Sequence, residues 1–141
     1  MTTIAWDGTT LAADRQSTWG GTPIRVRKVH KLRAPDGSFI LYGGSGNSIQ
    51  LGAFHRFVTG QTWRVPCIDD AQFMMIDAQR RVWIAQNNMD WHRIDVRRWA
   101  MGSGADYALG AMAYGASAME AVKVASGLDT GTGMGVDSVR F

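Results

Sequence analysis

Short apolar runs, alternating or rich in β-branched residues and separated by turn residues, fill the first third of the chain. Asp7-Gly8 is a two-residue hairpin signal between two such runs, and the Pro-Asp-Gly triplet within residues 34–38 predicts a second tight turn. Period-two alternation is typical of strands with one buried face. The pattern therefore predicts a meander of four strands, at residues 2–6, 9–14, 25–32 and 39–44.

The apolar spacing changes to a helical period after residue 46. Asn47 or Ser48 can cap a helix that ends at Gly60, with apolar positions at Ile49, Leu51, Phe54, Phe57 and Val58. Near the end of the chain, Ser117 and Glu120 have the spacing of a capping box. The other predicted elements are a hairpin of residues 71–77 and 81–86, helices at 105–115 and 117–126, and a last strand at 135–141.

The order of these elements predicts the fold class. Hairpins dominate and the helices are segregated from the strands, which indicates an α+β fold of antiparallel sheets covered by helices. A chain of 141 residues without an internal repeat or linker is expected to form one domain, spanning residues 1–141.

Composition indicates a globular protein and narrows its chemistry. Hydrophobic residues make up 45% of the chain and charged residues 19%, and the net charge of +3 arises from dispersed cations. One cysteine, Cys67, excludes an internal disulfide framework and fits a reducing compartment. The three histidines lack metal-ligand spacing, so neither a metal nor another cofactor is expected. No leader or membrane-length apolar run is recognisable, and we expect a cytoplasmic protein without membrane association.

One lysine conflicts with the alternation of the third predicted strand. Ile24, Val26, Lys28, His30 and Leu32 would share its apolar face, whereas its other cations would share the solvated face. The Lys28 stem could lie on apolar surface while its ammonium reaches water. Alternatively, a desolvated Lys28 could hold its ammonium against a carboxylate. The pattern alone leaves both interpretations open.

The second interpretation needs an acid and a nucleophile close by. Asp14 ends a neighbouring predicted strand, on the same face as Thr10 and Ala12. Thr2 would supply a nucleophile and a base in one residue once Met1 is removed, because its hydroxyl attacks and its freed α-amine accepts the proton. The unperturbed pKa of an α-amine is about 7.7–8.0, which suits a general base near neutrality.

Three other signals have structural explanations that we favour. Residues 129–131 form the Asp-Thr-Gly triplet of aspartic proteases, but the ten residues after them are too few for the sheet that holds such a loop. The glycines of residues 43–48 precede a helix without the ending of a phosphate loop, so a tight turn is favoured. Cys67 follows Pro66 in a predicted connection and is interpreted as structural or incidental.

Five segments, taken in order, resemble proteasome β-type subunits, and most closely the bacterial HslV peptidase, among the N-terminal nucleophile hydrolases. They are TTI, LAADRQST, RVRKVHKL, YGGSGNS and AMGSGADYA, and the resemblance covers most of the chain. It implies a four-layer α-β-β-α sandwich of antiparallel sheets. One helical layer is expected to be shortened, because only one helix is predicted where the family usually has two long ones.

Position by position, the resemblance implies a threonine endopeptidase whose N-terminal nucleophile is Thr2. Asp14 and Lys28 would pair beneath Thr2 and tune it. The backbone N–H of Gly43 would form the oxyanion hole.

The resemblance also assigns residues around the terminal amine and the substrate. Ser103 would contact the amine, and Asp129 with Thr132 would orient it, although serine is usual at the position of Thr132. Substrate contacts would come from Ser17, Thr18, Val26, His30, Leu41 and Ser45.

The partners that the resemblance implies are further copies of the chain in a ring-shaped homo-oligomer, unfolded polypeptide as substrate, and an ATP-dependent unfoldase. The alternative is a catalytically silent assembly subunit, which the joint presence of Thr2, Asp14, Lys28 and Ser103 argues against. A nucleic-acid partner is not expected, because the small basic excess at residues 25–33 lacks an aromatic platform.

Overall fold

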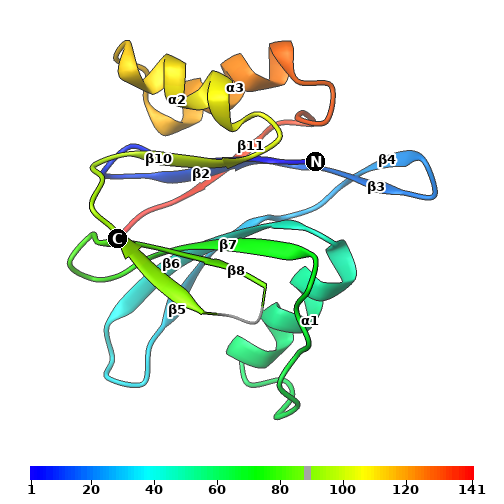
Figure 1. Cartoon of the computed structure of the whole chain (residues 1–141), viewed down its shortest axis with the longest axis vertical. Coiled ribbons are helices and arrows are strands. Elements are labelled where there is room, and N and C mark those ends of the chain that lie inside the picture. The colour runs from blue at the N-terminus through cyan, green and yellow to red at the C-terminus, as the bar shows by residue number, and fades with distance from the viewer. Residues whose placement is uncertain (88–89) are drawn as a thin grey trace.

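The computed structural model describes residues 1–87 and 90–141, which form antiparallel sheets and three helices (Figure 1). One sheet has the strand order β10-β1-β2-β11, a second has the order β5-β6-β7-β8-β9, and β3 and β4 form a separate ribbon. The strands are β1 (Thr3–Trp6), β2 (Leu11–Asp14), β3 (Gln16–Trp19), β4 (Thr22–Arg25), β5 (Val29–Arg33), β6 (Phe39–Gly46), β7 (Ala71–Ile76), β8 (Val82–Gln86), β9 (Trp91–Ile94), β10 (Trp99–Gly102) and β11 (Val136–Val139).

The helices are α1 (Ser48–Val58), α2 (Ala105–Ala113) and α3 (Ala118–Leu128). The side chain of Asn47 accepts the N–H groups of Ile49 and Gln50 at the start of α1, and Ser117 Oγ accepts the N–H of Glu120 at 3.2 Å at the start of α3. These side chains satisfy N–H groups that have no partner within their helix. The capping residues expected from the sequence are therefore confirmed, with Asn47 rather than Ser48 capping α1.

The two sheets stack face to face, and the helices lie on their outer sides (Figure 1). Helices α2 and α3 cover the four-stranded sheet, whereas α1 is the one helix of the described residues on the far side of the five-stranded sheet. The expected four-layer α-β-β-α sandwich is therefore wrong as stated. The chain is mostly antiparallel sheet, and 11 residues of α1 packed on β6 do not make a complete fourth layer.

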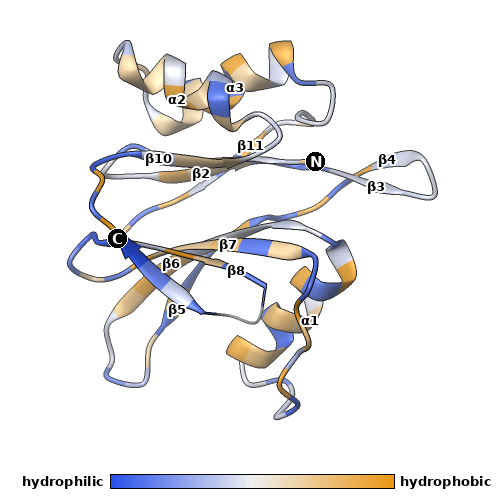
Figure 2. Cartoon of the chain, viewed as in Figure 1, coloured by the Kyte–Doolittle hydropathy of each residue, from blue (hydrophilic) through white to orange (hydrophobic). Residues whose placement is uncertain are grey.

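Alternation along the strands builds the interior, and Figure 2 shows apolar residues along strands of both sheets and in the helices. Ile4 and Trp6 of β1 point into the core between the sheets, while Ala5 points toward α2 and α3. Alanines at the equivalent places of β2 and β10 let the helices approach closely. The core between the sheets contains Ile4, Trp6, Leu11, Ala13, Val29, Leu41, Met74, Ile76, Val82 and Met101.

The predicted strand at residues 25–32 is interrupted. Gly20 and Gly21 have φ of 55° and 82°, and this tight turn folds residues 16–25 into the projecting ribbon of β3 and β4. β4 ends at Arg25, and β5 begins at Val29, which is fully buried although the alternation placed it with the solvated cations. Lys28 is therefore buried because it lies in the bend between the ribbon and the sheet, not because it lies on a strand face.

Two short strands, β9 and β10, were not predicted from the sequence. Each has four residues, and the partners that make them strands, β8 and β1, come from other parts of the chain. Within the described residues, no helix is long and apolar enough to cross a membrane.

Gly102, at the end of β10, brings the backbone against the start of β1. Its φ is +96°, and a Cβ atom at this position would lie 2.0 Å from the carbonyl oxygen of Thr2. A real side chain cannot approach a backbone oxygen this closely, and an L-residue at positive φ is strained as well. Glycine at this position therefore sets the distance between β10 and the residue that precedes β1.

Gly102→Ala is expected to lower the free energy of unfolding by at least about 2 kcal/mol, from strain and displacement of β1. Gly110→Ala in α2 is the matched control, because a Cβ there meets no atom within 4 Å and alanine favours a helix. Urea unfolding measures both. Equal stability of the two variants would contradict the close approach.

Candidate functional site

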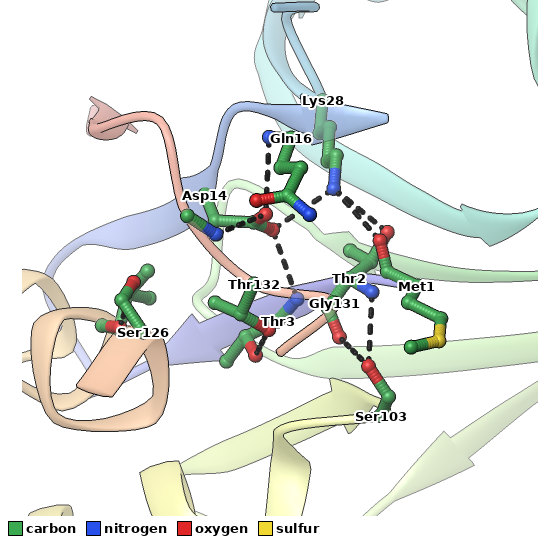
Figure 3. A network of polar contacts seen from close by, with 12 residues as sticks. Met1, Thr2, Thr3, Asp14, Gln16, Lys28, Ser103, Ser126, Gly131 and Thr132 are labelled. Carbon is green, nitrogen blue, oxygen red and sulfur yellow. Dashed lines mark hydrogen bonds and ion pairs between the residues drawn. The ribbon is translucent and has the colours of Figure 1, made fainter. Parts of the chain in front are cut away.

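Three acceptors surround the ammonium of Lys28, which is buried near the N-terminal end of β1 (Figure 3). Lys28 Nζ lies 2.9 Å from Asp14 Oδ1, 2.9 Å from Thr2 Oγ1 and 3.1 Å from the carbonyl oxygen of Met1. An ammonium has three protons, and each has an acceptor here. The snorkelling interpretation does not describe this lysine, because its charged end points inward at a hydroxyl and a carboxylate.

Asp14 is held in place by the backbone as well as by Lys28. Its Oδ1 accepts the N–H of Thr3 at 3.0 Å, and its Oδ2 accepts the N–H groups of Gln16 and Gly133, each at 3.1 Å. The side chain is fully buried, and every one of these donors comes from a different segment. Four donors offset the cost of burying the carboxylate and fix its oxygens toward Lys28.

A second network reaches the backbone nitrogen of Thr2. The N–H of Thr2 donates to Ser103 Oγ at 3.2 Å, and Ser103 Oγ donates to Asp129 Oδ2 at 2.6 Å. Thr132 Oγ1 also donates to Asp129 Oδ2, at 2.6 Å, and lies 2.7 Å from Thr3 Oγ1. Since the single hydroxyl proton of Thr132 goes to Asp129, Thr3 is the donor in the last pair. Asp129, at the C-terminal end of α3, therefore orients two hydroxyl groups beside Thr2.

Burial and charge act in opposite directions on the groups of this site. Burial lowers the pKa of Lys28, and the Asp14 carboxylate counteracts part of that effect. For Asp129, burial raises the pKa, but hydrogen bonds from Ser103 and Thr132 outweigh it and the pKa of this carboxyl is lowered. The site thus holds Asp129 as an acceptor at neutral pH.

Met1 covers the site. Its side chain lies over Gly131, where a Cβ would come within 2.2 Å of Met1 Cβ, and its carbonyl takes one proton of Lys28. Met1 is itself 67% exposed. In this form the nitrogen of Thr2 belongs to an amide, which is not a base.

A cavity of about 250 Å³ opens beside Thr2 and is lined by Ser17, Val26 and His30 among the residues expected to contact substrate. Three other residues expected to contact substrate do not line this cavity: Thr18, Leu41 and Ser45. Thr18 is exposed on the ribbon, Leu41 is buried in the core between the sheets, and Ser45 is buried next to a separate hollow near Asp70.

The cavity wall also contains residues that the sequence did not indicate. Arg27, Tyr42 and His55 lie there, with Leu51 and Phe73 supplying apolar surface. The ring centroids of His30 and His55 are 4.3 Å apart, and the Tyr42 hydroxyl is hydrogen-bonded to His55 Nδ1. His55 is on α1 and His30 on β5, so only the helix-to-sheet packing reveals this cluster. The one signal in the sequence was the presence of an aromatic or histidine residue in each of β5, β6 and α1.

The backbone beside the cavity changes its pairing at Gly43. Gly43 pairs with Val29 of β5 and with Met74 of β7, and β6 then continues to Gly46 with a partner on the β7 side alone. Gly44 and Gly46 line the cavity, whereas Gly43 does not. The oxyanion role of Gly43 stays a prediction, and the backbone just beyond it has N–H groups outside the β5 pairing.

No group of three or more histidine, cysteine, aspartate or glutamate side chains within residues 1–87 and 90–141 is arranged to hold a metal ion. Cys67 is a free, exposed thiol outside the set of residues around Thr2.

Comparison with known proteins identifies the fold and not the family. No family model and no curated protein matches the chain. Among solved structures, Thiobacillus denitrificans BPH in complex with epoxomicin aligns with 99% of this chain and 97% of its own, at 17% identity and a TM-score of 0.69. Anbu from Hyphomicrobium sp. strain MC1 aligns with 100% of this chain and 82% of its own, at 11% identity and a TM-score of 0.79. The Anbu complex of Pseudomonas aeruginosa, solved as a helical assembly, gives 11% identity, 100% and 81% coverage, and a TM-score of 0.77.

These neighbours correct the specific likeness inferred from the sequence. BPH and Anbu are proteasome-like proteins of the N-terminal nucleophile type, and they give no support to a particular likeness to the HslV peptidase. At 11–17% identity the likeness establishes the fold alone. The expectation that HslV is the closest match is therefore wrong, and the chain has a proteasome-like fold.

Lys28→Ala is expected to lower the free energy of unfolding by about 3–5 kcal/mol, because it leaves the Asp14 carboxylate buried without its counter-charge. Lys28→Met keeps the stem and deletes the charge, and combining it with Asp14→Asn should recover part of the loss. Lys28→Arg should destabilise less than Lys28→Ala. Urea unfolding of Lys28→Met, Asp14→Asn and the double variant against wild type gives the coupling energy, and strictly additive effects would show that the pair does not interact.

Proposed function

We propose that this chain is a threonine-type peptidase in which Thr2, freed of Met1, is the nucleophile. The observation that carries the proposal is the contact of Lys28 Nζ with both Thr2 Oγ1 and Asp14 Oδ1 at 2.9 Å. A buried ammonium beside a hydroxyl stabilises the negative charge that forms on its oxygen. The proteasome-like fold and its N-terminal nucleophile neighbours agree with this chemistry at a coarse level.

In the proposed reaction, the free α-amine of Thr2 is the general base. It takes the proton of Oγ1 as that oxygen attacks the carbonyl carbon of a peptide bond. Ser103 Oγ, 3.2 Å from this nitrogen, accepts one amine N–H and so turns the nitrogen lone pair toward Oγ1. The Asp129 carboxylate keeps the Ser103 proton away from the amine, because Ser103 donates to it at 2.6 Å.

The remaining steps return the enzyme to its starting state. The tetrahedral oxyanion is stabilised by backbone N–H groups at the end of β6, where Gly43 is the predicted donor and Gly44 lines the cavity. Collapse forms a Thr2 ester, and the protonated amine gives its proton to the departing amine. Water, deprotonated by the same α-amine, then hydrolyses the ester and releases the acid product.

The proposal requires cleavage of the bond between Met1 and Thr2. Cleavage converts the Thr2 nitrogen from an amide to an amine. It also removes the hydrogen bond from Lys28 Nζ to the Met1 carbonyl and opens the space over Gly131. Met1 is exposed and Thr2 is small, which suits removal of the methionine. We further propose that residues 1–141 act as one unit, since the site takes residues from β1, β2, the bend before β5, the β10–α2 turn and the α3–β11 loop.

The alternative is an assembly subunit without activity. The covering of the site by Met1, with its carbonyl bound to Lys28, is the observation that favours it. The mass of the purified protein distinguishes the two, because retention of Met1 excludes an amine base at Thr2.

A peptide boronate or epoxyketone is expected to form a one-to-one adduct with wild-type protein that lacks Met1, measured by intact mass and located by peptide mapping. Thr2→Ala should abolish the adduct and the hydrolysis of fluorogenic peptides, and it should lower the free energy of unfolding by about 1–3 kcal/mol, because the buried Lys28 ammonium loses one of its three acceptors. Thr2→Ser keeps the hydroxyl and should retain both. An adduct that persists unchanged in Thr2→Ala would refute the assignment.

We also propose that copies of the chain assemble into a closed ring that encloses the sites. Two large aromatic side chains, Trp63 and Tyr114, are 90% and 98% exposed, and their burial between copies would remove apolar surface from water. The Anbu complex of Pseudomonas aeruginosa is a helical assembly, so the neighbours support self-association without fixing its closure.

Mass photometry at micromolar protein is therefore expected to show one oligomer of fixed mass, and electron microscopy of the same sample should show closed particles. A monomer would refute self-association. Filaments whose length grows with concentration would refute closure and leave self-association standing.

A further inference from the structure

The cavity beside Thr2 contains a cation that no acidic side chain pairs. Arg27 Nε donates to the carbonyl of Val29 at 3.1 Å, and none of the ion pairs between described residues includes Arg27. The anchored Nε fixes the guanidinium at the wall and leaves its other N–H groups without a protein acceptor within residues 1–87 and 90–141. No aspartate or glutamate lines the cavity.

The two imidazoles of the wall add hydrogen-bond donors of the same kind. Burial raises the pKa of Tyr42, so its hydroxyl keeps its proton, and it is hydrogen-bonded to His55 Nδ1. In the tautomer in which Tyr42 donates, the N–H of neutral His55 is on Nε2, away from Tyr42. His30 makes no hydrogen bond to another described residue through its ring, and it too has one N–H in its neutral form.

Both imidazoles are uncharged at neutral pH. Burial, with His55 and Arg27 nearby, lowers the pKa of His30 to about 4, and burial lowers that of His55. Asp137 is the acid that acts on His30, and it is already bound to Arg15 at 2.6 Å. Two cations therefore line this wall: Lys28, which is paired with Asp14, and Arg27, which has no carboxylate partner among the described residues.

Val26, Leu51 and Phe73 supply apolar surface in this wall, beside the hydroxyl groups of Ser17 and Ser48. Arg27 is exposed, whereas His30 and His55 are half-buried. An apolar substrate side chain would cover the imidazole N–H groups that face the cavity without offering them an acceptor. A site built from donors rejects a group that cannot accept, because each buried unpaired donor is costly. A side chain with an apolar stem and an anionic end satisfies both parts of the wall.

We propose that this cavity selects glutamate, or aspartate at lower rate, as the residue whose carbonyl Thr2 attacks, and that Arg27 is the specificity-determining residue. The inference rests on the proposed peptidase function. The methylene groups of glutamate lie against Leu51 and Phe73, and its carboxylate accepts from the Arg27 guanidinium and the imidazole N–H groups. An aspartate is one methylene shorter and reaches the donors less well.

The test uses four fluorogenic peptides that differ only in the residue before the scissile bond: glutamate, glutamine, leucine or lysine. The kcat/KM for glutamate is expected to exceed that for glutamine by about tenfold, since only the charge differs, and lysine should be the poorest. Arg27→Gln should lower the ratio of kcat/KM for the glutamate substrate to kcat/KM for the leucine substrate by about tenfold, and this ratio cancels any general loss of activity from the lost Arg27–Val29 contact. Arg25→Gln is the matched control, because Arg25 is exposed on β4 and does not line the cavity.

A binding experiment separates this inference from the proposed function. The full-length Thr2→Ala variant is titrated with N-acetylated peptide amides ending in glutamate or glutamine, and the ring signals of His30 and His55 are followed by NMR. The glutamate peptide is expected to shift both signals and to bind about tenfold more tightly.

Hydrolysis that favours leucine or lysine, or an Arg27→Gln variant that keeps the glutamate preference, overturns the inference and leaves the peptidase function standing. Absence of hydrolysis together with tighter binding of the glutamate peptide overturns the function and supports the pocket. Absence of both hydrolysis and binding preference overturns both.

Discussion

The contact of a buried ammonium with a carboxylate and a hydroxyl is the constraint around which this chain is organised. The three residues are each at least nine-tenths buried: Lys28, Asp14 and Thr2. The side chains of the Lys28–Asp14 ion pair are therefore largely shielded from water. Two ions in a low-dielectric interior must be paired and fully hydrogen-bonded, or the fold is penalised by several kcal/mol. The surrounding backbone meets this demand, because N–H groups from three separate segments converge on Asp14.

Convergence of so many segments requires close backbone approaches, and glycines make them possible. Gly102 lies against the Thr2 carbonyl, and a Cβ at Gly104 would come within 2.0 Å of Thr3 Oγ1. These two positions flank Ser103, so the serine that contacts the Thr2 nitrogen is placed by backbone geometry on both sides. The hydroxyl of Thr132 then connects Thr3 to Asp129. Compared with the serine expected here from the resemblance, threonine keeps the hydroxyl and adds a methyl group, in a residue that is 3% exposed.

The sequence predicted which residues lie together around Thr2 better than it predicted the path of the chain. Lys28 was singled out because it interrupts an apolar alternation, yet the strand that was supposed to contain it breaks at residues 26–28. The hairpin signals at Asp7-Gly8 and residues 77–81 are local and were reliable, as were the caps at Asn47 and Ser117. The strand β10 and the aromatic–imidazole cluster depend on contacts between distant segments, which no local period records. The ribbon of β3 and β4 is a local hairpin around Gly20 and Gly21, and it was missed because this Gly-Gly pair was interpreted as a connection. The short connection after α1 indicated that a second outer helix is missing. The sequence did not indicate how little of the sheet α1 covers.

The bend at residues 26–28 gives one short segment two separate tasks. Val26 and Arg27 line the cavity, and Lys28 turns inward to the nucleophile. In an extended strand, neighbouring side chains point to opposite faces. Arg27 and Lys28 could then not both point to the side of the sheet on which the cavity and Thr2 lie. The break in the strand removes that restriction. It also couples the two tasks sterically, since displacement of Arg27 would move the backbone that positions Lys28. Two contacts hold the backbone of this bend: Arg27 Nε donates to the Val29 carbonyl, and Val29 pairs with Gly43. A side-chain substitution can therefore alter the selectivity of the cavity without altering the reactivity of Thr2 only if it leaves this backbone in place.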